Sequence, residues 1–216
     1  MEIRAVFVDA AGTLLHPREP VGVTYARTAR LHGHEVDPVV VERQFRAAMR
    51  SRRGAAQAGD GRVFWEGVVR EAVGTDDPRV YEDLYRWYTT PRAWWLDVEA
   101  LTALGKIARM GIVLGIISNW DTRLRTLYTR FALDRMFPVL ICSAEHEVEK
   151  PDPAIFRIAC EVAGVRPREA VHIGDDQEYD VDGAARAGLI GIRHDEDDGW
   201  RDLPERILRL RRLPFR

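Results

Sequence analysis

Carboxylates, a hydroxyl and a lone amine occur in this chain close behind short apolar runs that are typical of buried strands. These residues are Asp9, Ser118, Lys150, Asp175 and Asp176. Parallel strands end at one edge of their sheet, and open α/β folds place their ligands at that edge. We therefore expect these side chains to meet in one cleft.

The residue types in this group point to phosphoryl chemistry. Paired carboxylates such as Asp175 and Asp176, with only oxygen donors nearby, are typical ligands for a hard cation, most plausibly Mg²⁺. A cation together with Lys150 and Ser118 would suit a tetrahedral dianion. Asp9 could then attack phosphorus, because the positive charges screen its repulsion from the phosphoryl oxygens.

The elements that must position these groups alternate between strands and helices along most of the chain. This alternation predicts an α/β fold, a Rossmann-like three-layer arrangement in which helices cover both faces of a parallel sheet. The strands are expected at residues 3–8, 112–117, 139–142, 170–173 and 189–193.

Residues 17–92 interrupt the alternation with helices only, which predicts an inserted four-helix cap on a core made of residues 1–16 and 93–216. The helix faces are apolar and aromatic. They include Val41 and Phe45, Trp65 and Val69, and Tyr81, Leu84, Tyr85 and Tyr88. The proline-rich segment 16–20 reads as a hinge, and the glycine-rich loop 54–61 reads as a linker.

Composition narrows the possible partners and compartment. Hydrophobic residues make up 46% of the 216 residues, which is enough for a substantial buried core. The net charge is −2, so neither nucleic acid nor an anionic membrane is an expected partner. Cys142 and Cys160 lack metal-site spacing, and no apolar run is long enough to span a bilayer. We expect a reduced cytoplasmic protein without an export signal, acting as a monomer or a homodimer.

Four motifs resemble those of the haloacid dehalogenase-like (HAD) hydrolases, and the resemblance covers nearly the whole chain. The motifs are Asp9-x-x-Gly12-Thr13, Ser118, Lys150, and Gly174-Asp175 with Asp180. The helical insert lies where that family places a type-1 cap. The segments 117–121 and 149–153 look most similar to the subgroup of the haloacid dehalogenase-like hydrolase domain-containing protein 3.

The resemblance implies a role for each matching residue. Asp9 and Lys150 would be catalytic, with Asp9 forming an aspartyl-phosphate and Lys150 balancing charge. Mg²⁺ would be bound by the carboxylates of Asp9 and Asp175 and by the backbone carbonyl of Ala11. Gly12, Thr13, Ser118 and Asn119 would bind a small phosphorylated substrate, and Asp176 and Asp180 would support the metal from the second layer.

Ala11 departs from the pattern of the family's phosphatases, which usually carry a second Asp at this position as general acid and base. Losing such a group costs about 10²- to 10⁴-fold in rate. We therefore expect a phosphohydrolase of reduced scope, restricted to acidic leaving groups such as acyl or aryl phosphates, or one in which His16 or a cap residue supplies the base.

Other readings of Ala11 stay open. The protein could be a catalytically impaired HAD-fold binding or regulatory protein. It could be a 2-haloacid dehalogenase, although that chemistry uses no metal and the intact Gly174-Asp175-Asp176 argues against it. Phosphonoacetaldehyde hydrolases also carry Ala here, but they need a cap lysine, and the only lysines in this chain are Lys106 and Lys150.

Overall fold

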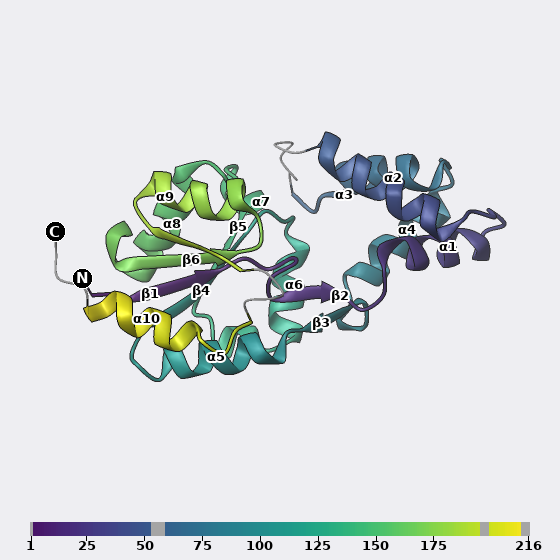
Figure 1. Cartoon of the computed structure of the whole chain (residues 1–216). Coiled ribbons are helices and arrows are strands. Elements are labelled where there is room, and N and C mark those ends of the chain that lie inside the picture. Colours follow the sequence, from purple (N-terminus) through teal and green to yellow (C-terminus); the bar gives the residue numbers. More distant parts are fainter. Residues whose placement is uncertain (1, 53–58, 195–198, 213–216) are drawn as a thin grey trace.

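A five-stranded parallel sheet forms the centre of the computed structural model, which describes residues 2–52, 59–194 and 199–212 (Figure 1). The strand order is β5-β4-β1-β6-β7, so the first strand lies in the middle. The strands are β1 (Ala5–Val8), β4 (Val113–Ser118), β5 (Val139–Cys142), β6 (Ala170–Gly174) and β7 (Ile190–Arg193). The expected α/β fold and parallel sheet are confirmed, with strand ends within two residues of the prediction.

Helices cover both faces of the sheet, as Figure 1 shows. One face carries α5 (Val98–Ala108), α6 (Arg123–Arg130) and α10 (Leu203–Arg212), and the other carries α8 (Pro153–Ala163) and α9 (Gly183–Ala187). No helix among the described residues is long and apolar enough to cross a bilayer.

The central strand β1 is buried on both sides, which explains its unbroken apolar run. Val6 and Val8 belong to the core under α5 and α6, whereas Ala5 and Phe7 belong to the core under α8. This division follows from the two-residue period of a strand, because successive side chains point to opposite faces. The same burial fixes the position of Asp9, the residue that follows the strand.

The insert between β2 (Leu15–Pro17) and β3 (Trp94–Leu96) is the expected four-helix unit with a core of its own. Its helices are α1 (Val21–Leu31), α2 (Pro38–Ser51), α3 (Arg62–Val73) and α4 (Pro78–Tyr88). The exact domain boundaries stay a prediction. Residues 53–58 of the expected linker loop lie outside the described residues.

Three helices begin with the same local sequence motif, an Asp-Pro pair. Asp37, Asp77 and Asp152 each accept hydrogen bonds from backbone N–H groups of the first turn, and Pro follows at the first helical position. The carboxylate satisfies donors that have no partner within the helix, and proline is preset for the helical φ angle. The motif therefore sets the start of α2, α4 and α8 locally.

The expected hinge around Pro17 is a short antiparallel ribbon. Strands β2 and β3 pair with Leu15 opposite Leu96 and Pro17 opposite Trp94. The remaining short elements are η1 (Pro91–Ala93), η2 (Leu133–Arg135), α7 (Ser143–His146), η3 (Pro167–Glu169) and the π-helix η4 (Gln177–Asp182). Figure 1 shows the ribbon between the core and the helical unit, so both connections of the insert leave the core together.

Candidate active site

The carboxyl ends of β1, β4 and β6 meet at a cleft of about 290 Å³ beneath the helical unit. All but two of the predicted site residues line it, the exceptions being Gly12 and Thr13. The cleft-lining members of the predicted set are Asp9, Ala11, Ser118, Asn119, Lys150, Asp175, Asp176 and Asp180. The structure therefore brings together residues more than 170 positions apart in the chain.

Lys150 is the centre of the charged network in this cleft. Its Nζ lies 2.6 Å from Asp9 Oδ1 and 2.5 Å from Asp180 Oδ1, and its side chain is buried. Ser118 Oγ donates to the same Asp9 oxygen at 3.1 Å. The buried His172 adjoins this network, because its Nε2 lies 2.9 Å from Asp180 Oδ1. Asp9 is thus held in place through one carboxylate oxygen.

Burial and charge set the protonation behaviour of the network. Burial raises the pKa of Asp9 to about 6, against the opposing effect of Lys150. Burial would also raise the pKa of Asp180, but Lys150 and His172 outweigh it and hold that pKa well below its ordinary value. Burial would lower the pKa of Lys150, yet Asp9 and Asp180 together keep it above its ordinary value, so the amine stays charged.

Three carboxylates in the cleft form a group that fits a divalent cation. One oxygen each of Asp9, Asp175 and Asp180 lies within 4.8 Å of the others. These donors are all oxygens, the ligand type that Mg²⁺ prefers. Three carboxyl groups share the cleft with one lysine, so their full ionisation would carry more negative charge than Lys150 can balance. Burial, together with the charge of Asp180, raises the pKa of Asp175.

Asp180 therefore belongs to the carboxylate group that could hold a metal, and its predicted supporting role stays a prediction. Its neighbour Asp176 supports it: the backbone N–H of Asp176 donates to Asp180 Oδ2 at 3.1 Å. The Asp176 side chain accepts from the N–H groups of Glu178 and Tyr179 at 2.9 and 3.0 Å, and thereby starts the π-helix η4. Only the π-helical turn brings Asp180 back into the cleft, which the spacing of the motif alone does not show.

The turn after Asp9 brings Thr13 and Gly12 against Asp175. Thr13 Oγ1 donates to Asp175 Oδ1 at 3.3 Å. Gly12 has a φ of +84°, and a Cβ at this position would lie 2.9 Å from Asp175 Oδ2. Its N–H donates to Leu15 O at 3.0 Å. In this structure both residues thus shape the position of Asp175; their predicted role in binding substrate stays a prediction.

Asn119, predicted to bind substrate, is bound to the backbone of Lys150. Its Nδ2 donates to Lys150 O at 2.8 Å, and its Oδ1 accepts from Lys150 N at 2.7 Å. This two-point contact joins the loop after β4 to the segment that carries the lysine. Asn119 consequently orients the backbone of Lys150, and Asn119 itself also lines the cleft.

Several further residues line the cleft beyond the set that we predicted as site residues. Met49, Arg52 and Phe64 come from the helical unit, and Glu149 and Tyr179 come from the core. Arg52 is held by Glu71 through contacts of 2.8 and 2.5 Å. Burial raises the pKa of Glu149. Their contribution depends on the placement of the insert over the core, for which no motif spacing gives a signal.

His16 is not among the described residues that line the cleft, although it was a candidate for the missing base. It belongs to β2, and its ring stacks on Trp95 with 4.4 Å between the ring centroids. Ala11 itself is exposed to the cleft. The position at which we expected a general acid in a phosphatase thus presents only a methyl group to the cleft.

A second, apolar cavity of about 220 Å³ adjoins the cleft. Ala11, Met49 and Asn119 line both spaces. The rest of the cavity wall is largely aromatic and comes from all four helices of the helical unit, from β2 and β3, and from the segment that joins β4 to α6. The helix faces predicted to pack the cap core, with Trp65, Tyr81 and Tyr85, therefore also enclose a space above Ala11.

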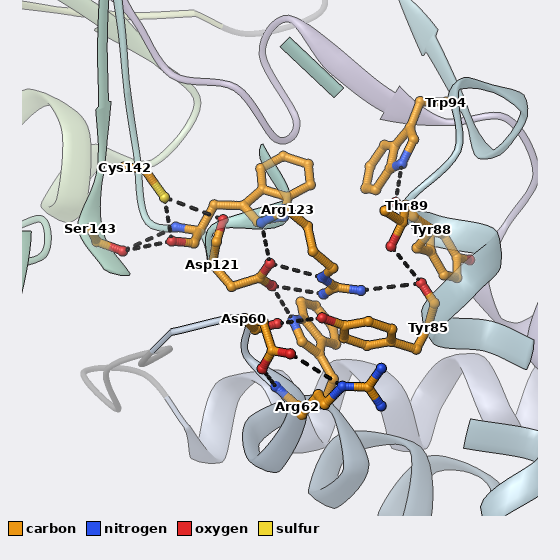
Figure 2. Close-up of polar contacts among 12 residues, drawn as sticks. Asp60, Arg62, Tyr85, Tyr88, Thr89, Trp94, Asp121, Arg123, Cys142 and Ser143 are labelled. Atoms are coloured by element: carbon orange, nitrogen blue, oxygen red, sulfur yellow. Dashed lines mark hydrogen bonds and ion pairs between the residues drawn. The ribbon is translucent and has the colours of Figure 1, made fainter. Parts of the chain in front are cut away.

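The loop between β4 and α6 fastens the helical unit to the core (Figure 2). Asp121 and Arg123 form a buried ion pair, with Arg123 Nη2 at 2.7 Å from Asp121 Oδ2. Trp65 Nε1 donates to the same oxygen at 2.8 Å, and the guanidinium carbon lies 4.0 Å from the centre of the Tyr85 ring. Tyr85 in turn donates to the Asp60 carbonyl at 2.9 Å.

Comparison with known proteins decides the family. The model of the family described as haloacid dehalogenase-like hydrolase matches residues 3–188. The chain belongs to the haloacid dehalogenase-like hydrolases. It is 33% identical to haloacid dehalogenase-like hydrolase domain-containing protein 3 of Danio rerio, over 99% of this chain and 96% of that protein. The predicted family and its subgroup are confirmed.

Solved structures of HAD-like hydrolases share the fold. A HAD phosphatase from Thermococcus onnurineus matches with a TM-score of 0.65 and 24% identity, covering 90% of this chain and 87% of that one. A 2-haloacid dehalogenase from Pseudomonas syringae matches with a TM-score of 0.65 and 22% identity, covering 96% and 99%. The fold therefore does not separate the two chemistries, and the arrangement of the site has to do so.

Proposed function

We propose that this HAD-like hydrolase is a Mg²⁺-dependent phosphohydrolase that acts on a small phosphorylated compound through Asp9. One observation carries the proposal: Lys150 holds Asp9 at 2.6 Å while oxygens of Asp9, Asp175 and Asp180 converge within 4.8 Å. A nucleophile, a fixed positive charge and a set of cation ligands thus share one cleft. A dehalogenase does not need the cation ligands.

In the proposed reaction, a carboxylate oxygen of Asp9 bonds to phosphorus as the bond from phosphorus to the leaving oxygen breaks. Lys150 and the Ser118 hydroxyl stabilise the charge on the phosphoryl oxygens. Water then attacks the phosphorus of the aspartyl-phosphate, which releases inorganic phosphate and restores Asp9. Bound to Asp9, Asp175 and Asp180, Mg²⁺ would supply electrostatic stabilisation of the phosphoryl group.

The methyl group of Ala11 supports a narrowed substrate range. A leaving group that is stable as an anion needs no proton donor, whereas an alkoxide does. We therefore propose acyl or aryl phosphates as substrates. We also propose that the protein works in the cytoplasm as a monomer or homodimer and not on nucleic acid, in keeping with its net charge of −2.

A phosphatase assay with Mg²⁺ tests the proposal on the wild type, Asp9→Asn and Ala11→Asp. The wild type should release phosphate from an acyl or aryl phosphate, and Asp9→Asn should lose at least about 10³-fold in rate because it removes the nucleophile. Asp202→Asn, the same change at an exposed acid, should keep full activity. Ala11→Asp should add alkyl phosphates to the substrate range, with gains of about 10²- to 10⁴-fold.

Other outcomes would favour the remaining readings. A silent wild type that gains activity as Ala11→Asp would indicate a binding or regulatory protein whose site has lost turnover. Halide release from a 2-haloacid without Mg²⁺ would indicate a dehalogenase. Equal activity of the wild type and Asp9→Asn would show that Asp9 is not the nucleophile.

A further inference from the structure

The aromatic cavity above Ala11 has the size of a single substituted ring. Its volume is about 220 Å³, and an apolar protein cavity of about 150 Å³ already binds benzene. Its wall includes Tyr25, Trp65, Tyr81, Tyr85, Tyr88 and Trp94. Aromatic side chains favour offset or edge-on contacts with a further ring, beyond the gain from burial alone.

This cavity and the charged cleft adjoin each other and share part of their walls. Ala11, Met49 and Asn119 line both spaces, whereas Asp9 and Lys150 line the cleft but not the cavity. A ligand with its phosphoryl group beside Asp9 could therefore pass over Ala11 and place its other end among the aromatic rings. The methyl group at the junction adds no charge that would repel an apolar group.

The polar atoms at the cavity wall favour an uncharged ring. Arg123 lines the cavity, but Asp121 balances its charge through contacts of 2.8 Å to Nε and 2.7 Å to Nη2. Tyr81 is only 7% exposed, and its hydroxyl has no hydrogen-bond partner among the described residues. That hydroxyl would be available to one polar substituent on a bound ring.

We infer that the substrate is an aryl phosphate ester whose ring occupies this cavity, an inference that rests on the proposed function. Asp9 bonds to phosphorus, and the electron pair of the breaking P–O bond stays on the aryl oxygen. A phenol has an ordinary pKa of about 10, so it leaves as the phenolate without a proton from position 11. A small acyl group would leave as readily but would leave the ring-sized cavity unused.

Binding of two unreactive phosphonates tests the inference without relying on turnover. In the presence of Mg²⁺, calorimetry should show phenylphosphonate binding at least about tenfold more tightly than methylphosphonate, the factor expected for moving a ring from water into an apolar site. Both ligands carry the same charged group, so the cleft contributes to each alike. The difference between them therefore reports the cavity.

Filling the cavity should remove the preference for the ring. Val69→Phe adds volume from α3, and Val21→Phe does so from a partly exposed position on α1. Both should bind methylphosphonate as the wild type does, which shows that the cleft is intact, but should bind phenylphosphonate about tenfold less tightly. Val63→Phe is the matched control, because it makes the same change at an exposed position of α3 outside the cavity and should keep the preference.

Distinct results would overturn the inference and the proposed function. Equal affinity of the wild type for the two phosphonates overturns the aryl inference and leaves the phosphohydrolase proposal standing. A ring preference that survives in both filled variants also overturns it, because the ring then binds elsewhere. Failure of both phosphonates to bind the wild type with Mg²⁺ overturns the phosphohydrolase proposal as well.

Discussion

The protein contains two clusters of buried charge on neighbouring loops at the same edge of the sheet, and they differ in charge balance. At Lys150, one amine contacts two carboxylates, and the third carboxylate, Asp175, lies within the same group. At Arg123, one guanidinium contacts one carboxylate, and Trp65 donates a further hydrogen bond to Asp121. Surplus negative charge makes the first cluster able to hold a cation, whereas the second is balanced and joins two parts of the fold.

The largest effect is expected from Lys150→Met, which removes the amine that forms ion pairs with both Asp9 and Asp180. Removing one partner of a buried ion pair costs about 3–5 kcal/mol. At about 2–4 °C per kcal/mol for a chain of this size, the melting temperature should fall by about 10 °C. Calorimetric melting measures this, and an unchanged melting temperature would show that the cluster is not held together by this charge.

A somewhat smaller effect is expected from Arg123→Met, because the pair lies at the edge of the cavity. Asp121 would remain buried without its counter-charge, at a cost of about 3 kcal/mol. The double variant Asp121→Asn with Arg123→Met should recover part of this loss, since removing both charges of a balanced pair leaves none uncompensated. Chemical denaturation of the single and double variants measures both, and a double variant no more stable than the single one would contradict a purely structural pair.

The smallest effect is the stabilisation by Mg²⁺ itself. At a concentration 100 times its dissociation constant, a bound ion stabilises the folded state by about 2.7 kcal/mol. The melting temperature of the wild type should therefore rise by about 5–10 °C with Mg²⁺ and return on chelation. Asp175→Asn should lose this response, and Asp202→Asn should keep it. A wild type insensitive to Mg²⁺ would refute the cation site.

The sequence was sufficient to predict the fold, because β1, β4, β5, β6 and β7 are short buried runs with helices between them. It also predicted the group that lines the cleft, since the ends of parallel strands share one edge. It did not show that Asp180 joins Asp9 and Asp175 in one carboxylate group, which depends on the π-helix that Asp176 starts. Nor did it show the ribbon of β2 and β3, because three-residue strands give no clear periodicity.

The aromatic cavity illustrates a different limit of sequence patterns. Trp65 on α3 and Tyr81 and Tyr85 on α4 each lie on a helix face with apolar residues at helical spacing, as residues of a packed core do. All three do pack in the core of the helical unit. Whether four helices close completely or leave a space depends on side-chain shape in three dimensions. A periodic apolar face therefore predicts burial, but not whether other side chains or a ligand complete the packing.

The pairing of Pro17 with Trp94 bears on how such a molecule can be assembled in evolution. The two chain segments that enter and leave the helical unit arrive side by side in hairpin register, so the whole unit occupies the position of a hairpin turn. Exchange of the unit for a two-residue turn, or for a different set of helices, would leave the pairing of the core sheet unchanged. Most of the aromatic residues around the cavity thus lie in a segment inserted between two strands of the ribbon, whereas the charged residues of the cleft lie at the edge of the sheet.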